Sequence, residues 1–184
     1  MKSGESSYRR YLDGDRSGFD EIIDMYHDNL IYFLTRYVGN ENDAEDIAAE
    51  TFLEMLIHPS WYSFKSSLKT YIYSIARNKA VDFVRKNKRR VFTDGFDNVS
   101  LSSSFDETWD ETVRAEQSGR VADALSKLKR EYAEILYYVY FEQLDTDEIT
   151  KIMKKSSRQV SNLLYRAKAA MKNELTKGGF DDEE

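Results

Sequence analysis

Apolar residues recur at helical spacing along most of this chain. Over residues 19–38 they lie three or four positions apart, which is typical of an α-helix with one buried face. Gly39 followed by Asn40 predicts where that helix ends. A second pattern of this kind covers residues 68–88, where most of the apolar positions fall on one side. The first half of the chain is therefore predicted to be helical.

A further helix is predicted between these two. Asn42 with Glu45 resembles a capping box, in which two side chains satisfy free backbone groups at a helix start. The helix should run to about Ile57, because Pro59 cannot continue it. Residues 61–67, rich in aromatic and serine side chains, are predicted to form a loop.

The second half starts near Thr112, after residues 91–110, which have no clear period and are expected to be an extended linker. Helical spacing then resumes, with a break near Lys129-Arg130. The apolar positions of this pattern are Val121, Leu125, Leu128, Tyr132, Leu136 and Val139. A short helix at residues 146–153, a polar turn and a longer helix at residues 158–172 predict a helix-turn-helix.

These patterns predict an all-α protein of two small helical domains joined by a flexible linker. We place the first domain at residues 9–90, the linker at 91–112, the second domain at 113–176 and a disordered acidic tail at 177–184. The composition agrees, since the chain of 184 residues has one proline and eight glycines. It has no cysteine, which excludes disulfides and thiolate metal sites.

Several classes of protein fit the sequence poorly. No apolar run is long enough to span a bilayer, and residues 1–10 lack the apolar core of a secretion signal, so we expect a cytoplasmic protein without membrane insertion. The histidines, His27 and His58, lie far apart and have no partner motif. Glycine-rich phosphate loops and metal-ligand spacings are missing from the sequence. We therefore expect no catalytic residue, no metal and no cofactor.

Charge is sorted into blocks, although the net charge is −6. Residues 13–54 and 94–116 are mainly acidic, whereas residues 65–90 and 150–172 are mainly basic. Because charges are screened over about 8–10 Å, a ligand responds to the local block rather than to the total. The blocks predict two kinds of partner, namely DNA at the basic blocks and a cationic protein surface at an acidic one.

Basic and aromatic residues lie together along residues 61–85, an arrangement that binds single-stranded DNA because cations follow the backbone while rings stack on bases. The candidate residues are Trp61, Phe64, Lys65, Tyr71, Ser74, Arg77, Asn78 and Arg85. The alternative is that the aromatic rings belong to the core and the charges to a solvated face. For Trp61 and Tyr73 taken alone, that alternative is favoured.

Two further surfaces are predicted on helices. An acidic stripe with helical spacing comprises Asp43, Asp46, Glu50 and Glu54. It suits docking onto a basic helix, although a solvated face is the usual explanation for such a stripe. The second surface is the basic, hydrogen-bonding face of the helix-turn-helix, a unit that places its second helix in a DNA major groove. Its candidate residues are Lys155, Arg158, Gln159, Ser161, Asn162, Tyr165 and Arg166.

These segments resemble a known family. Residues 43–53 are similar to conserved region 2.2 of bacterial sigma factors, and residues 71–85 look like regions 2.3 and 2.4. Glu148-Ile149 and residues 160–167 resemble region 4.2. The size and order of the motifs fit the extracytoplasmic-function group of RNA polymerase sigma factors.

The resemblance implies a promoter-specificity subunit that is not itself an enzyme. Region 2.2, with the acidic stripe, would dock on the clamp helices of core RNA polymerase. Regions 2.3 and 2.4 would recognise and melt the −10 element, with a flipped base entering the loop at residues 61–67. The helix-turn-helix would read the −35 element as duplex DNA, and the linker would pass near the RNA path. Nucleoid association within the holoenzyme and an anti-sigma partner are also expected.

The chain departs from the family pattern at several positions. Tyr71 stands where Trp is usual, and stacking should survive this change. Lys154 stands in the turn where Gly is common, which makes the turn geometry less certain. Lys79 interrupts the apolar side of its helix and is expected to extend outward. Two alternatives remain open: a helix-turn-helix transcription regulator that acts without replacing a sigma subunit, and a polymerase-binding protein that does not start transcription.

Overall fold

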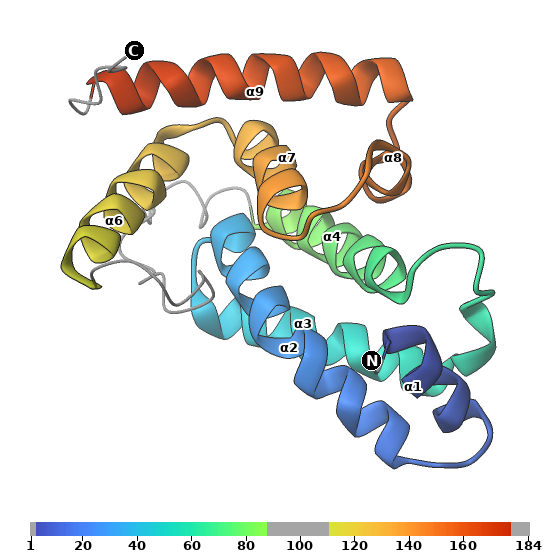
Figure 1. Cartoon of the computed structure of the whole chain (residues 1–184). Coiled ribbons are helices and arrows are strands. Elements are labelled where there is room, and N and C mark those ends of the chain that lie inside the picture. The colour runs from blue at the N-terminus through green and yellow to red at the C-terminus, as the bar shows by residue number, and fades with distance from the viewer. Residues whose placement is uncertain (1–2, 88–110, 178–184) are drawn as a thin grey trace. The chain divides into compact units, whose positions relative to one another are not determined.

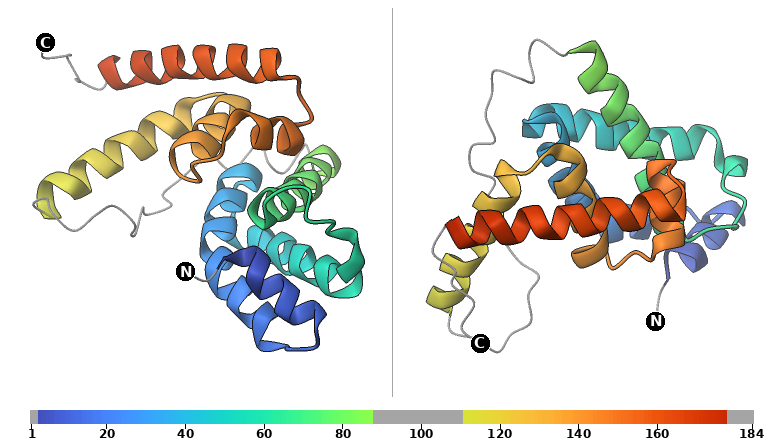
Figure 2. Two further views of the ribbon diagram at one scale, coloured as in Figure 1. Left: turned by 45° about the vertical axis from the view of Figure 1, so that its right-hand side comes forward. Right: turned by 90° about the horizontal axis from the view of Figure 1, so that it is seen from above.

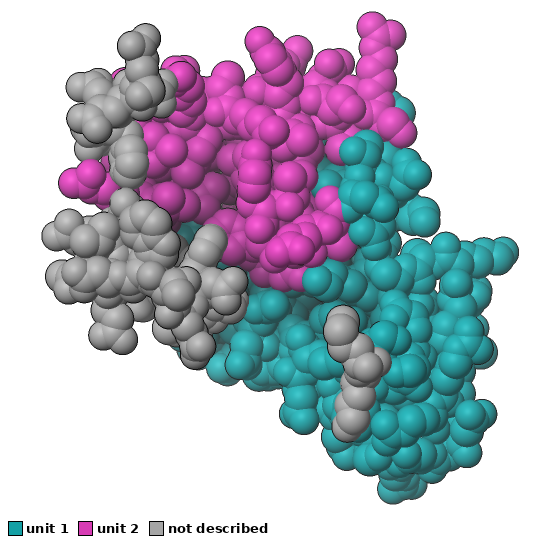
Figure 3. Space-filling view, in the orientation of Figure 1, with its two compact units in different colours: residues 1–95, 145–156 teal, residues 96–144, 157–184 magenta. Residues whose placement is uncertain are grey.

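The computed structural model describes residues 3–87 and 111–177, with side chains from residue 119 onward in the second segment. Every regular element in these ranges is helical, which confirms the predicted all-α class. Residues 91–110 of the predicted acidic linker, all but the first residue of the predicted tail, and Lys88 lie outside the described residues. The last two residues predicted as linker, 111 and 112, are helical instead. The chain divides into two compact units, residues 1–95 with 145–156 and residues 96–144 with 157–184 (Figure 3).

The first unit is built around helix α2 (Ser17–Val38), whose apolar face is buried as its spacing predicted. Gly39 ends α2 in the left-handed conformation, with φ of 94°, and its N–H donates to the carbonyl of Thr35. Glycine adopts this conformation without the steric cost of a Cβ. Helices α1 (Gly4–Leu12), α3 (Glu41–Ile57) and α4 (Leu68–Lys86) pack against α2 (Figures 1 and 2).

The predicted start of α3 is wrong by two residues. Asn40, not Asn42, is the N-cap, because its backbone is extended and its side-chain oxygen accepts a hydrogen bond from the N–H of Asp43 at 2.8 Å. The predicted end at Ile57 is confirmed, and Pro59 begins the 3-10 helix η1 (Pro59–Trp61). A loop then leads to α4, which Ser67 caps by accepting from the N–H of Thr70.

Helix α1 has no counterpart in the sequence prediction. Ser3 and Ser6 form a capping box at its start, and Tyr8 is completely buried. The helix crosses α2 where Gly18 sits, and a Cβ on Gly18 would collide with the carbonyl oxygen of Ser7. Gly18 thus allows the close approach that brings α1 into the core of the first unit.

Helix α8 (Thr146–Met153) belongs to the first unit by its contacts and packs against α4. The predicted bounds of this helix are confirmed. Its Asp145 and Glu148 form a capping box, and the Glu148 carboxylate also accepts hydrogen bonds from the hydroxyls of Ser67 (2.6 Å) and Thr70 (2.9 Å). Thr70 is buried at this contact.

The second unit comprises α6 (Glu111–Lys127), α7 (Arg130–Tyr140) and α9 (Ser157–Lys177). The predicted break near Lys129-Arg130 is confirmed. Residues from all three helices are buried, namely Ala124, Leu125, Ile135, Leu136, Tyr138, Val160 and Ala167. Tyr138 satisfies its buried hydroxyl by donating to the carboxylate of Glu134.

The turn after α8 explains why glycine is common at this position. Lys154 has φ of 54° and ψ of 44°, the left-handed conformation, and its N–H donates to the carbonyl of Thr150. A side chain with a Cβ pays a steric penalty of about 1 kcal/mol or more in this region. The sequence therefore keeps the turn geometry but adds backbone strain at Lys154.

Replacing Lys154 with glycine should raise the free energy of unfolding by about 1 kcal/mol, because the strain is removed. Lys154→Ala is the matched control, since it removes the same charge but keeps the Cβ. Urea denaturation of the full chain, followed by circular dichroism, measures both. Equal stability of the two variants would show that the charge, and not the backbone, sets the difference from the natural chain.

Candidate functional site

The acidic stripe lies along one side of α3. Asp46 and Glu50 are exposed, and the side chain of Glu50 has 65% of its surface free. Asp43 is half-buried near the start of the helix, where it contacts the side chain of Asn40. A carboxylate there is stabilised by the positive end of the helix dipole. The two middle acids are thus the members most available to a partner.

Lys79 contacts the stripe rather than extending outward into solvent. Its ammonium, from α4, lies 2.9 Å from a carboxylate oxygen of Glu54 and 3.6 Å from one of Glu50. The expectation for Lys79 is therefore wrong, because an acidic neighbour on α3 offers the cation a partner within reach. Lys79 neutralises the C-terminal end of the stripe and holds Glu54, of which 29% is exposed.

Apolar side chains beside the stripe were missed by the sequence analysis. Leu53 and Ile57 are 53% and 60% exposed. At 100° per residue they fall next to Glu50 and Glu54 on the helix, away from the buried face. Neighbouring large apolar side chains left in water on one side of a helix are typical of a protein-binding surface. Helical spacing could have identified both residues, because it places neither of them on the apolar face that packs inward.

The aromatic candidates of η1 and α4 have two different environments. Trp61 is 58% exposed and stacks on His58, with ring centroids 3.8 Å apart and planes 6° apart. Tyr73, by contrast, is fully buried. The alternative that both rings belong to the core therefore holds for Tyr73 and fails for Trp61.

Tyr62 is the centre of a second aromatic group. Its ring lies 4.5 Å from that of Phe64 and 5.1 Å from that of Tyr71, so these two candidate residues share a neighbour. Phe64 is half-buried and has φ of 59°, a rare conformation for a bulky residue. Burial raises the pKa of Tyr62 to about 12, with the negative charge of Glu5 acting in the same direction. Tyr62 therefore stays neutral and donates to the carbonyl of Ser66.

The polar candidates continue along α4. Ser74 is half-buried and donates its hydroxyl to the carbonyl of Thr70, while Arg77 and Asn78 are half-buried and Arg85 is exposed. Arg85 pairs with Asp82 at 3.2 Å. Fourteen residues of helix separate Arg85 from Tyr71, which corresponds to about 21 Å. The structure therefore does not bring Arg85 to the aromatic group.

The face of α9 predicted to read duplex DNA lies on the surface. Its candidates Arg158, Gln159, Ser161, Asn162, Tyr165 and Arg166 are exposed, whereas Lys155 in the preceding turn is half-buried. The ring of Tyr165 has 77% of its surface free. The helix starts at Ser157, so most of these side chains occupy its first three turns.

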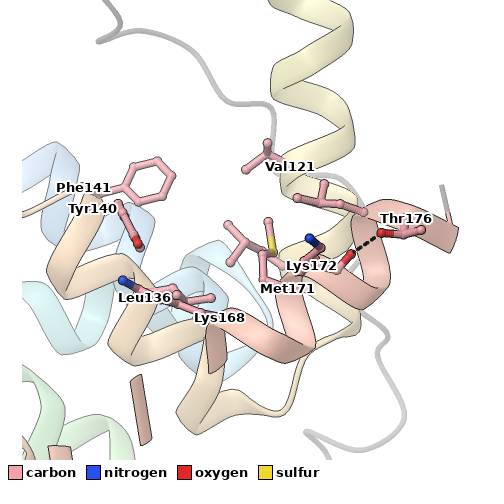
Figure 4. Close-up of a pocket in the computed structure, with 10 residues that line it drawn as sticks. Val121, Leu136, Tyr140, Phe141, Lys168, Met171, Lys172 and Thr176 are labelled. Atoms are coloured by element: carbon pink, nitrogen blue, oxygen red, sulfur yellow. Dashed lines mark hydrogen bonds between the residues drawn. The ribbon is translucent and has the colours of Figure 1, made fainter. Parts of the chain in front are cut away.

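The C-terminal half of α9 has a different environment. It forms a groove of about 520 Å³ with α6 and α7, lined by Leu125, Leu136, Met171 and Leu175, with Lys168 and Lys172 among the other lining residues (Figure 4). The Lys168 ammonium lies 5.7 Å from the ring centre of Tyr140. None of the candidate DNA-reading residues lines the groove. The residues predicted to read DNA therefore lie on a part of α9 that does not line the groove.

Within residues 3–87 and 111–177, no helix is long and apolar enough to cross a membrane. Over the same part of the chain, no group of three or more His, Cys, Asp or Glu side chains could hold a metal ion.

Family models match both halves of the chain. Sigma-70 region 2 matches residues 22–90, and Sigma-70, region 4 matches residues 118–171. The first covers most of α2 and all of α3 and α4, and the second covers the end of α6, all of α7 and α8, and most of α9. Helix α1 lies outside both matches.

Individual relatives agree with the family models. The ECF RNA polymerase sigma factor SigM of Bacillus subtilis is 30% identical over 89% of this chain and 98% of its own length. SigW of the same organism, also an ECF RNA polymerase sigma factor, is 26% identical over 88% of this chain and 91% of its own.

Solved structures share the fold. The sigma factor RpoE from Bartonella quintana, solved with the anti-sigma factor NepR, has a TM-score of 0.64 at 18% identity and covers 86% of this chain and 96% of its own. CnrH, solved with the cytosolic domain of CnrY, has a TM-score of 0.66 at 16% identity, covering 95% and 97%. With two region models in order and a 30% identical relative matched over nearly its whole length, this chain belongs to the extracytoplasmic-function family of RNA polymerase sigma factors.

Proposed function

We propose that this sigma subunit binds core RNA polymerase, recognises the −10 element and recognises the −35 element through three separate surfaces. Residues 9–90 would bind core RNA polymerase and recognise and melt the −10 element, residues 91–112 would link, and residues 113–176 would recognise the −35 element. The single observation that supports this division is that the acidic side chains lie on α3, the aromatic and basic ones on α4 with the segment before it, and the hydrogen-bonding ones on α9.

The polymerase-binding surface would consist of the acidic stripe, Asp43, Asp46, Glu50 and Glu54, with Leu53 and Ile57 beside it. Carboxylates attract a basic partner helix over distance and set its orientation, while the apolar side chains supply area that is removed from water. Lys79 would limit the number of free charges at one end of the surface, since it already pairs with Glu54.

The −10 surface would combine aromatic side chains before and at the start of α4 with polar and basic side chains along α4. Tyr62, Phe64 and Tyr71 form an aromatic group at which an unpaired base could stack, and Trp61 offers an exposed ring nearby in sequence. Each such stack contributes about 1–3 kcal/mol, which offsets the few kcal/mol needed to unstack a base. Lys65, Ser74, Arg77, Asn78 and Arg85 would contact the strand along the helix.

Tyr71→Ala should slow strand opening more than it weakens closed-complex binding, because the ring is lost from the aromatic group. Tyr71→Phe is the matched control. The Tyr71 hydroxyl is buried and has no hydrogen-bond partner among the described residues, so its removal should not lower stability. Permanganate footprints of promoter complexes measure the unpaired thymines, and footprints of the alanine variant equal to the natural chain would contradict the assignment.

The −35 surface would be the exposed face of α9, with Lys155, Arg158, Gln159, Ser161, Asn162, Tyr165 and Arg166 contacting duplex DNA. Arginine and asparagine make bidentate hydrogen bonds to guanine and adenine edges in the major groove. Such contacts need side chains that are free to reach the bases, as those of Arg158 and Asn162 are.

Run-off transcription with purified core polymerase on a promoter library tests the proposal. The expected result is initiation at templates that share two sequence elements and that core polymerase alone does not use. A transcription regulator acting without polymerase exchange would instead bind its duplex alone and leave core polymerase inactive.

The subunit would contribute no catalytic residue of its own and would act in the cytoplasm, on the nucleoid when it is part of the holoenzyme. We also propose an anti-sigma partner, because the structurally similar RpoE was solved in complex with one. Co-purification from the native host, followed by a transcription assay with the captured protein, would test this partner.

A further inference from the structure

Helix α1 contacts the base-accepting loop at three points. Glu5 accepts a hydrogen bond from the N–H of Leu68, the first residue of α4, at 2.7 Å. Tyr8 donates its hydroxyl to the carbonyl of Pro59 at 3.0 Å. The guanidinium of Arg9 lies 4.2 Å from the centre of the Phe64 ring. One face of one short helix therefore contacts the start and the middle of the segment between α3 and α4, and the first residue of α4.

These contacts act on a segment that is strained. Phe64 occupies the left-handed region with φ of 59°, which costs a residue with a Cβ about 1–2 kcal/mol and persists only where the surroundings hold it. Arg9 covers one side of its ring as a cation–π partner, and Tyr8 approaches with ring centroids 6.2 Å apart. Tyr8 also packs edge-on against Tyr62, at 5.3 Å.

The ionisation states of Glu5 and Tyr8 allow both side chains to make these contacts at neutral pH. Burial opposes the charge of Glu5, but hydrogen bonds from the Leu68 N–H, from its own N–H and from Ser3 outweigh it and hold its pKa below the ordinary value. Glu5 is therefore a carboxylate at neutral pH and supplies a negative group at the N-terminus of α4, where the helix dipole favours one. Burial raises the pKa of Tyr8, so its hydroxyl remains a donor.

We infer that α1 is a positioning element for −10 recognition, in which Glu5, Tyr8 and Arg9 hold the loop in the form that accepts an unpaired base. This inference rests on the proposed role of the loop. A loop that is already in its bound form loses less conformational entropy on binding, so a base binds more tightly without any contact to α1 itself. The region 2 family match begins at residue 22 and does not include this helix.

The test uses holoenzyme and forked promoter templates whose non-template −10 strand is single-stranded. Each unpaired nucleotide is replaced in turn by an abasic site, and the ratio of affinities with and without the base is measured. The natural chain should show a ratio of roughly ten at the position that the loop accepts. Arg9→Met should lower that ratio by about three-fold, because it removes the cation–π contact but keeps a side chain of similar length.

Matched variants separate positioning from a general effect on the fold. Arg16→Met removes the same charge at an exposed position outside the loop contacts and should leave the ratio unchanged. Glu5→Ala should lower the ratio as Arg9→Met does, and Glu5→Gln should restore it, since the amide oxygen can still accept from Leu68. Binding of each variant to core polymerase should equal that of the natural chain.

Three results would each be decisive. A lower ratio for Arg9→Met and Glu5→Ala, with Arg16→Met unchanged, supports the positioning role. Equal losses of affinity on base-containing and abasic templates, with the ratio unchanged, would overturn it and leave α1 a purely structural helix. If the natural chain itself shows no abasic-sensitive position, the assignment of the loop under the proposed function fails instead.

Discussion

Reversing the charges of Asp46 and Glu50 together to lysine should weaken binding to core RNA polymerase by about 100-fold or more. Two like-charge contacts against a basic partner helix cost several kcal/mol, and each 1.4 kcal/mol is a factor of ten. Both side chains lie on the surface of α3, and the ion pair that is lost, between Glu50 and Lys79, is long and exposed on the Glu50 side, so the fold should be largely unaffected. Fluorescence anisotropy of a labelled sigma subunit titrated with core polymerase measures the change.

Glu45→Lys is the matched control for this experiment. Glu45 is exposed on the same helix, one residue from Asp46, but at 100° per residue it lies on a different side from the stripe. The control should bind core polymerase nearly as well as the natural chain. If the double reversal also binds normally while circular dichroism shows a folded chain, the docking surface lies elsewhere.

Changing Arg158 and Asn162 to alanine, one at a time, should each reduce discrimination for the upstream promoter element by about 1–3 kcal/mol, or roughly 5- to 150-fold. The reason is that a bidentate hydrogen bond to a base edge is lost while the rest of the interface stays in place. Transcription from promoters with intact and mutated −35 elements measures the ratio. The −10 footprint and core binding should stay as they are.

Asn173→Ala provides the comparison on the same helix. Asn173 is also exposed but lies three turns further along α9, beyond the predicted DNA-reading face. It should leave the ratio between intact and mutated templates unchanged. Should Arg158→Ala and Asn162→Ala behave like Asn173→Ala, the first turns of α9 do not read the promoter.

Much of the architecture followed from local pattern. Apolar spacing identified α2, α4, α7 and α9, and Pro59 and Gly39 marked helix ends because one lacks an N–H and the other adopts positive φ freely. The N-cap of α3 could not be predicted from side-chain type alone, because Asn40 and Asn42 both offer a capping oxygen. Backbone conformation decided between them, and it is extended at Asn40.

The sequence by itself determined the helical class, the sorting of charge and the residues on the polar faces of α3 and α9, because helical periodicity assigns each residue to a side. Only the tertiary structure decided which neighbours those faces meet. It paired Lys79 with Glu54, buried Tyr73 while leaving Trp61 exposed, and brought α1 onto the loop before α4. Helix α1 buries Tyr8 and approaches α2 closely at Gly18, and both features depend on packing rather than on a local pattern.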